Sequence, residues 1–250
     1  MATQRSTPLH ISRVRVRSAS SSTMSDVSDA DDIEREALRL NRRYLSEVVE
    51  RFTLCPFAER SRREGQVKEC VFQQESAEIF EPSLSGISAL WPHEKVEVAL
   101  FMYPLLNLGR LDFEHFVRRL RTFDTDRHEV GTAPFAMAAF HPDAEPRLED
   151  PERLVPFIRR SPYPTIQLVR RTALDRVRGS TDEGTAYWDL ELLSSPWRQK
   201  PEPTPLRERI ARANLATVLE VGVTAVEAVM KDIFRDRDET HQRLFGTKPA

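Results

Sequence analysis

The stretch Val98-Ala99-Leu100-Phe101-Met102 decides the fold class. It is an almost continuous apolar run, and Tyr103-Pro104 follows it directly. A run without polar alternation is typical of a strand that is covered on both faces of a sheet. Proline cannot donate to a sheet ladder, so the strand should end before Pro104. We therefore expect a central strand over residues 96–103, with helices on both sides of it.

Three more stretches have strand character, at 67–73, 135–141 and 165–170. Helical patterns separate them, most clearly at 112–123 and 151–158. Strands that alternate with helices predict an α/β layer architecture. The expected fold is a single α/β domain with about four strands, parallel or mixed, covered by helices and closed by a long C-terminal helix. The sequence does not fix the strand order.

The N-terminal part of the domain should be helical from about residue 32 to 52, because apolar residues recur there at three- and four-residue steps. Pro56 should end this helix. It also suits the first position of a second short helix, up to about Arg63, which Gly65 would close.

The sequence predicts different structure for the two ends of the chain than for its centre. Residues 1–28 predict a disordered extension, which is either an organellar transit peptide or an upstream stretch before a true start at Met24. Residues 29–234 form the predicted domain, with a long loop insertion at 179–204 and a helix over 205–234. Residues 235–250 are expected to be a frayed tail.

Composition excludes several classes of protein. The chain has 250 residues, a formal net charge of −2 and 30% charged residues. The balanced charge disfavours nucleic acid, and no stretch approaches the about 20 apolar residues that span a membrane. Arginine pairs such as Arg170-Arg171 are interpreted mostly as solvated faces. Two cysteines without metal-site spacing indicate a reducing compartment, taken as the cytoplasm, and no cofactor or metal is predicted.

Cys55 is the first candidate for chemistry, because it lies at the junction of the two predicted helices. Backbone N–H groups at the start of a helix stabilise a thiolate and lower the pKa of the thiol. The functional interpretation is a nucleophilic or redox-active thiol. The alternative is a small buried side chain that fills the turn.

His141 and Tyr103 each end a predicted strand and precede a proline. If the two strands are parallel neighbours, both side chains lie at the carboxyl ends of the strands, where α/β proteins usually bind ligands. His141 would then act as a general base to a thiol or as a donor to an anion. A histidine that only caps a loop is the alternative.

The segment Arg160-Ser161-Pro162-Tyr163 is the most distinctive. Its prolines hold the loop extended, so that a guanidinium, a hydroxyl and a phenol form a candidate clamp for an anion. A stiff entry into the next strand is the alternative. Asn214, on the last predicted helix, would need polar partners if it faces inward.

These motifs together resemble a family of uncharacterised, mainly bacterial proteins, the domain of unknown function numbered 1415. The likeness rests on Thr53–Ala58, Phe140–Pro142, Arg160–Thr165 and Arg212–Ala216. It implies a compact α/β protein without an assigned activity. The chain departs from the family pattern at Tyr103, where members carry histidine, which weakens a two-histidine metal site.

Three functions follow from these residues. The first is a thiol-dependent enzyme that acts on an anionic substrate, with Cys55 as nucleophile, His141 as base and Arg160 orienting the substrate; Ser161, Tyr163, Tyr103 and Asn214 would contact the ligand. The second is a protein that binds a small anionic metabolite without catalysis. The third is an interaction or assembly protein, in which the long C-terminal helix and the tryptophan-bearing loop contact a partner, with an oligomer through the helix as one form. All site interpretations require Cys55, His141 and Arg160 to share one hollow.

Overall fold

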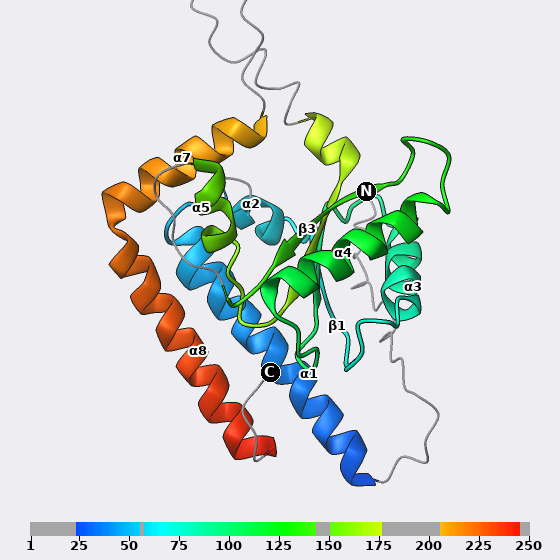
Figure 1. The fold of residues 1–250 in the computed structure, drawn as a ribbon, viewed down its shortest axis with the longest axis horizontal. Helices are drawn as coiled ribbons and strands as arrows, with labels where there is room; N and C mark the ends of the chain where they lie inside the picture. The colour runs from blue at the N-terminus through cyan, green and yellow to red at the C-terminus, as the bar shows by residue number, and fades with distance from the viewer. Residues whose placement is uncertain (1–23, 56–57, 144–150, 177–205, 246–250) are drawn as a thin grey trace, which may run out of the picture.

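The computed structural model describes residues 24–55, 58–143, 151–176 and 206–245. A four-stranded sheet lies between helices, and the long helices α1 and α8 run side by side (Figure 1). The elements in chain order are α1 (Met24–Tyr44), the π-helix η1 (Leu45–Glu50), α2 (Ala58–Arg63), β1 (Val67–Val71), α3 (Glu81–Leu90), β2 (Val98–Met102), α4 (Arg110–Thr125), β3 (Phe135–Phe140), α5 (Pro151–Ile158), β4 (Thr165–Arg170), α7 (Leu206–Val221) and α8 (Val223–Phe245).

The sheet is mixed and has the order β1-β2-β4-β3. Strand β1 pairs with β2 in parallel, whereas β4 is antiparallel to both β2 and β3. Strands β2 and β3 therefore run in the same direction with β4 between them. The α/β fold with about four strands is confirmed, and so is the central, buried position of β2.

One face of the sheet carries an aromatic cluster, which packs under α3 and α4. Its members alternate along the strands, as the two-residue period of a β-strand requires. At Gly86 of α3, an added Cβ would come within 3.0 Å of Phe72 and 3.1 Å of Phe101, so α3 approaches the sheet closely because it has no side chain there. The largest members of the aromatic cluster are Phe72, Phe80, Phe101, Tyr103, Phe113, Phe116 and Phe135.

The other face carries a second cluster, which we call the helical cluster. It joins α1, η1, α5, α7 and α8 around the loop before β4. Asn41 of α1 donates to Glu69 of β1 over 2.8 Å, which ties the helices to the edge of the sheet. Its fully or largely buried members include Leu40, Tyr44, Val48, Leu154, Phe157, Tyr163, Val226, Met230 and Ile233.

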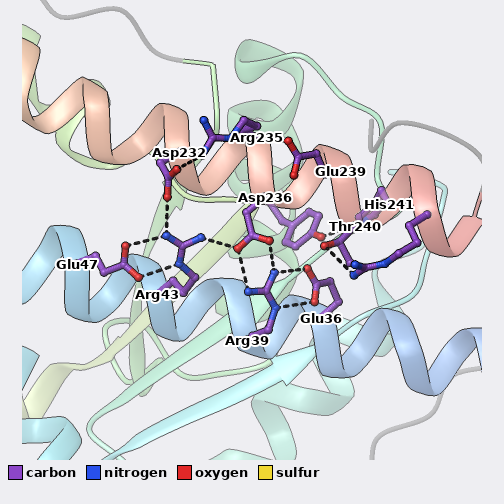
Figure 2. Close-up of polar contacts among 12 residues, drawn as sticks. Glu36, Arg39, Arg43, Glu47, Asp232, Arg235, Asp236, Glu239, Thr240 and His241 are labelled. Carbon is purple, nitrogen blue, oxygen red and sulfur yellow. Dashed lines mark hydrogen bonds and ion pairs between the residues drawn. The ribbon is translucent and has the colours of Figure 1, made fainter.

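An ionic network also fastens α8 to α1 (Figure 2). Asp236 of α8 accepts hydrogen bonds from Arg39 over 2.7 and 2.9 Å and from Arg43 over 2.5 Å. Arg39 in turn holds both oxygens of Glu36, and Arg43 holds both oxygens of Glu47. Arg39 therefore links Glu36 of α1 to Asp236 of α8, and Arg43 links Glu47 of η1 to the same aspartate.

The C-terminal helical region differs from its prediction. Instead of one helix over 205–234 there are two, α7 and α8, separated at Gly222, which has a φ of 88°. This left-handed conformation ends a helix, and glycine adopts it without steric cost. Helix α8 then continues to Phe245, past the point where fraying is expected, because residues such as Asp236 and His241 contact the rest of the fold.

The N-terminal helix also differs, since α1 begins at Met24 and already includes residues 24–28 of the predicted extension. Residues 1–23 and the predicted loop 179–204 lie outside the described residues. Within the described ranges, no helix combines the length and the apolarity that crossing a bilayer requires.

Candidate functional site

The carboxyl ends of β2 and β3 lie at the same end of the sheet, but the two strands are not the neighbours that the sequence prediction assumed, because β4 lies between them. In the register, Met102 and Phe140 are both partners of Thr165 at the start of β4. The residues directly after these two strand ends are Tyr103 and His141. They therefore lie at the same end of the sheet as the loop before Thr165. Two backbone hydrogen bonds join them, from Tyr103 N to Pro164 O over 2.9 Å and from His141 N to Arg159 O over 3.1 Å.

His141 is buried, and the backbone engages both nitrogens of its imidazole. Nε2 lies 2.9 Å from Leu108 O, and Nδ1 accepts from the Asp143 N–H over 3.1 Å. Burial lowers the pKa of His141, which the hydrogen bond to Leu108 partly opposes. The geometry therefore fits a neutral ring that donates from Nε2 and accepts at Nδ1. To take a proton from a thiol, this ring would first have to give up the Asp143 hydrogen bond.

Tyr103 lies inside the aromatic cluster and is fully buried. Its hydroxyl is 2.8 Å from Ser83 Oγ of α3, and its ring packs against Phe72, Phe113 and Phe116. Burial raises the pKa of Tyr103, so the phenol is neutral. Tyr103 and His141 both contact Phe113, at ring distances of 6.0 and 5.9 Å. Tyr103 and His141 therefore share Phe113 as a neighbour, but the Tyr103 hydroxyl points toward Ser83.

Arg160 lies where the loop before β4 meets α8. Its Nε donates to Pro142 O over 3.1 Å, and its guanidinium lies 5.6 Å from the Phe157 ring and 5.1 Å from the Phe234 ring. Glu227 Oε1 is 4.0 Å from Nη1, which is too far for a hydrogen bond. Only 13% of the Arg160 side chain is exposed. Burial lowers the pKa of Arg160, which still leaves the guanidinium charged.

Ser161 and Tyr163 hold the loop itself. Ser161 Oγ donates to Tyr163 O over 2.6 Å, and Thr165 Oγ1 donates to the same oxygen over 2.8 Å. The Tyr163 hydroxyl lies 2.6 Å from Nε2 of His241 on α8. The three groups of the predicted clamp therefore do not converge: Arg160 turns toward Pro142 and Phe234, whereas Ser161 and Tyr163 bind the loop backbone and α8.

Two residues of α8 complete this loop, and the sequence interpretation missed both. Arg237 Nη1 donates to Pro162 O over 2.7 Å, and His241 meets Tyr163. Both had been placed in the predicted tail. A signal was present, because Ile233, Arg237 and His241 follow one another at four-residue steps and so share one helix face.

Cys55 lies at the edge of the helical cluster and is half-buried. Its carbonyl accepts from the Ala58 N–H over 3.2 Å, at the start of α2. Thr53, two residues earlier, has a φ of 49°, and η1 is a π-helix. A β-branched residue in the left-handed region is strained, and such strain and π-helical turns both occur often at functional sites.

Cys55 packs in the helical cluster, whereas His141 packs against Phe113 of the aromatic cluster. Cys55 and Arg159 both lie near Tyr44. The Tyr44 hydroxyl is 3.4 Å from Ile158 O, and the charges of Cys55 and Arg159 both act on its pKa, which burial raises.

Asn214 is buried on α7, which packs against α5. Its side chain therefore faces inward, where a buried amide needs hydrogen-bond partners. In the described part of the chain, no group of three or more histidine, cysteine, aspartate or glutamate side chains is placed to hold a metal ion.

A sequence profile of the family described as "Protein of unknown function (DUF1415)" matches residues 36–187. This match covers more than half of the chain, from α1 to beyond β4, and the chain belongs to that family. No curated protein and no solved structure matches it. The matched range ends before α7 and α8, so Arg237 and His241 lie outside it.

Proposed function

We propose that the protein binds a small anionic ligand, with the Arg160 guanidinium as the charged anchor. The supporting observation is the state of this side chain. Among the described residues, neither Nη1 nor Nη2 of Arg160 makes a hydrogen bond, and the nearby carboxylate of Glu227 stays 4.0 Å away. A guanidinium that has lost most of its water without gaining a close counter-ion gains free energy when an anion binds.

Arg160 is also held in place before a ligand arrives. The Nε hydrogen bond and the two aromatic rings fix the plane of the guanidinium, so little rotamer entropy is left to lose on binding. The two terminal nitrogens form the planar fork that suits a carboxylate or a phosphate. Arg160 lies beside the carboxyl end of β3, and ligand sites in α/β proteins are usually found at such strand ends.

Calorimetric titration of the full chain with inorganic phosphate, malonate and a sugar phosphate tests this proposal. Arg160→Met should weaken the binding of the best probe by about tenfold or more, because a hydrogen bond to a charged group contributes about 1.5–3 kcal/mol. Arg119→Met is the matched control, since it removes one charge from an exposed pair with Glu78 on α4. Equal affinities of both variants, or no binding of any probe, would contradict the proposal.

A thiol-dependent enzyme is the second candidate, and the strained turn at Thr53 beside the half-buried Cys55 favours it. In this proposal Cys55 is the nucleophile and Arg160 orients an anionic substrate. His141 would serve as base only after releasing Asp143, because both of its ring nitrogens are engaged.

The alkylation rate of Cys55 against pH, measured in a Cys70→Ala background, tests the thiol. An activated thiol should give a rate that levels off below about pH 8, because the thiolate is then already formed. A rate that still rises at about pH 9, as for an ordinary cysteine, argues against an activated nucleophile.

A Further inference from the structure

The end of α8 is attached to the body of the protein by polar groups. Ile233 is the last buried apolar residue of α8 among those described, whereas the buried side chains beyond it are Thr240 and His241. Leu244, near the end of the helix, is exposed. Residues 235–245, which we call the latch, therefore have little apolar burial to hold them in place.

Contacts of three residues of the latch, Asp236, Arg237 and His241, attach it to other described parts of the chain, and Figure 2 shows those of Asp236. Asp236 binds the two arginines of α1, Arg237 donates to Pro162 O, and His241 Nε2 meets the Tyr163 hydroxyl at 2.6 Å. The first contact is partly open to solvent, whereas the Tyr163–His241 pair is buried. His241 is thus the titratable group of the latch that is most enclosed by the fold.

The groups that face His241 come from three elements. Glu36 lies on α1, the Tyr163 hydroxyl lies on the loop before β4, and Arg237 and Asp238 lie on α8 itself. Burial lowers the pKa of His241, Arg237 lowers it further, and the two acids oppose this effect. Both oxygens of Glu36 are already bound by Arg39, which limits what this acid can offer an imidazolium.

We propose that the latch is released by acid, when His241 takes up a proton and the last turns of α8 leave Tyr163 and Pro162. The docked imidazole binds a proton less readily than the free one. The free energy that favours the docked latch is therefore fully present above the ordinary histidine pKa of about 6.5. It is lost as the pH falls toward the lower pKa that His241 has in the docked state.

The second titratable contact responds at lower pH. Arg39 and Arg43 hold the pKa of Asp236 below its usual value, so this carboxylate keeps its charge until the pH falls below about 4. Mild acid therefore acts on His241 first. The latch adjoins the proposed anion anchor, because the Arg160 and Arg237 guanidinium groups each lie 5.1 Å from the Phe234 ring. The exchange test is read at residues 235–245 without any anion, so its outcome is independent of binding at Arg160.

Hydrogen–deuterium exchange of the full chain tests the latch, with rates corrected for the intrinsic effect of pH. Between about pH 7.5 and about pH 5.5, protection of residues 235–245 should fall severalfold or more relative to the rest of the chain, because the docked state loses stability as His241 takes up a proton. Strand β2, in the interior of the sheet, serves as an internal reference and should stay protected at both values.

Two variants at histidines separate the latch from general acid effects. His241→Gln should remove the pH dependence of the latch, because glutamine keeps hydrogen-bonding groups but does not titrate. His115→Gln, at an exposed histidine of α4, should leave it unchanged. The proposal is overturned if the wild-type latch is equally protected at both pH values, or if His241→Gln responds as the wild type does.

Tyr163→Phe gives a test that does not require His241 to be changed. It removes the hydroxyl that meets His241, so at about pH 7.5 the latch should already show the lower protection of the acidified wild type. Unchanged protection in this variant would also overturn the proposal. Circular dichroism of each variant confirms that the remaining helices are folded.

Discussion

The two faces of the sheet are stabilised in different ways, and each contains a buried tyrosine that shows the difference. In the aromatic cluster, Tyr103 pairs with Ser83, a partner that does not titrate near neutral pH. On the helical side, Tyr163 pairs with His241, and the charges of Glu36 and Arg237 act on it. We infer that the Tyr103–Ser83 pair is insensitive to salt and mild acid, whereas the attachment of α8 through His241 and Asp236 depends on both.

The largest expected effect lies in the aromatic cluster. Phe101→Ala should lower the free energy of unfolding by about 4 kcal/mol, because Phe101 is fully buried and the cavity lies under Gly86 and Phe72. Urea denaturation measures this loss. It should be the same at low salt and at about 1 M NaCl, since no charge is involved. A loss that changes with salt would break the contrast between the two faces.

The two tyrosines sharpen the comparison directly. Tyr103→Phe and Tyr163→Phe should each cost about 1–2 kcal/mol at about pH 7.5, because each leaves a buried partner without its hydrogen bond. At about pH 5.5 the cost of Tyr163→Phe should be smaller, since protonation has already weakened docking at His241 in the wild type. The cost of Tyr103→Phe should not change. Urea denaturation of both variants at the two pH values decides this.

The smallest expected effect concerns the ionic network. Asp236→Asn should cost about 1 kcal/mol at low salt, because partly exposed ion pairs contribute little individually. Most of this cost should disappear at about 1 M NaCl, where screening is strong. Glu78→Gln, in an exposed pair with Arg119 on the other face, is the control and should change stability little at either salt concentration. An effect of Asp236→Asn that persists at high salt would show that packing and not charge holds the helices.

Local patterns in the sequence were sufficient for the strands. All four were predicted: β2 and β3 are apolar runs, whereas β1 and β4 mix apolar and polar residues, and β2 was correctly placed in the interior of the sheet. The position of β4 between β2 and β3 was not predictable, since pairing between distant strands depends on the whole fold. Arg170 is a second example. It was interpreted as solvated, but it is buried and donates to carbonyl groups at and after the end of α3.

The candidate site was predictable in its parts but not in its arrangement. The sequence indicated a loop restricted by its two prolines, and in the structure the Ser161 hydroxyl also binds the backbone of that loop. Tyr103 and His141 follow the carboxyl ends of two strands that run in the same direction. The direction of each side chain depends on residues far away in the sequence. Ser83 of α3 turns the Tyr103 hydroxyl inward, and His241 binds Tyr163 from α8, so neither orientation can be obtained from the local motif.

The strand order also has a consequence for the nascent chain on the ribosome. Strand β3 pairs with β4, but β4 follows it in the sequence, after α5. While β1 and β2 can associate early, β3 has no partner strand until residues 165–170 have emerged. During synthesis the apolar edge of β3 stays open to wrong pairing, and the insertion of β4 is the event that completes the sheet.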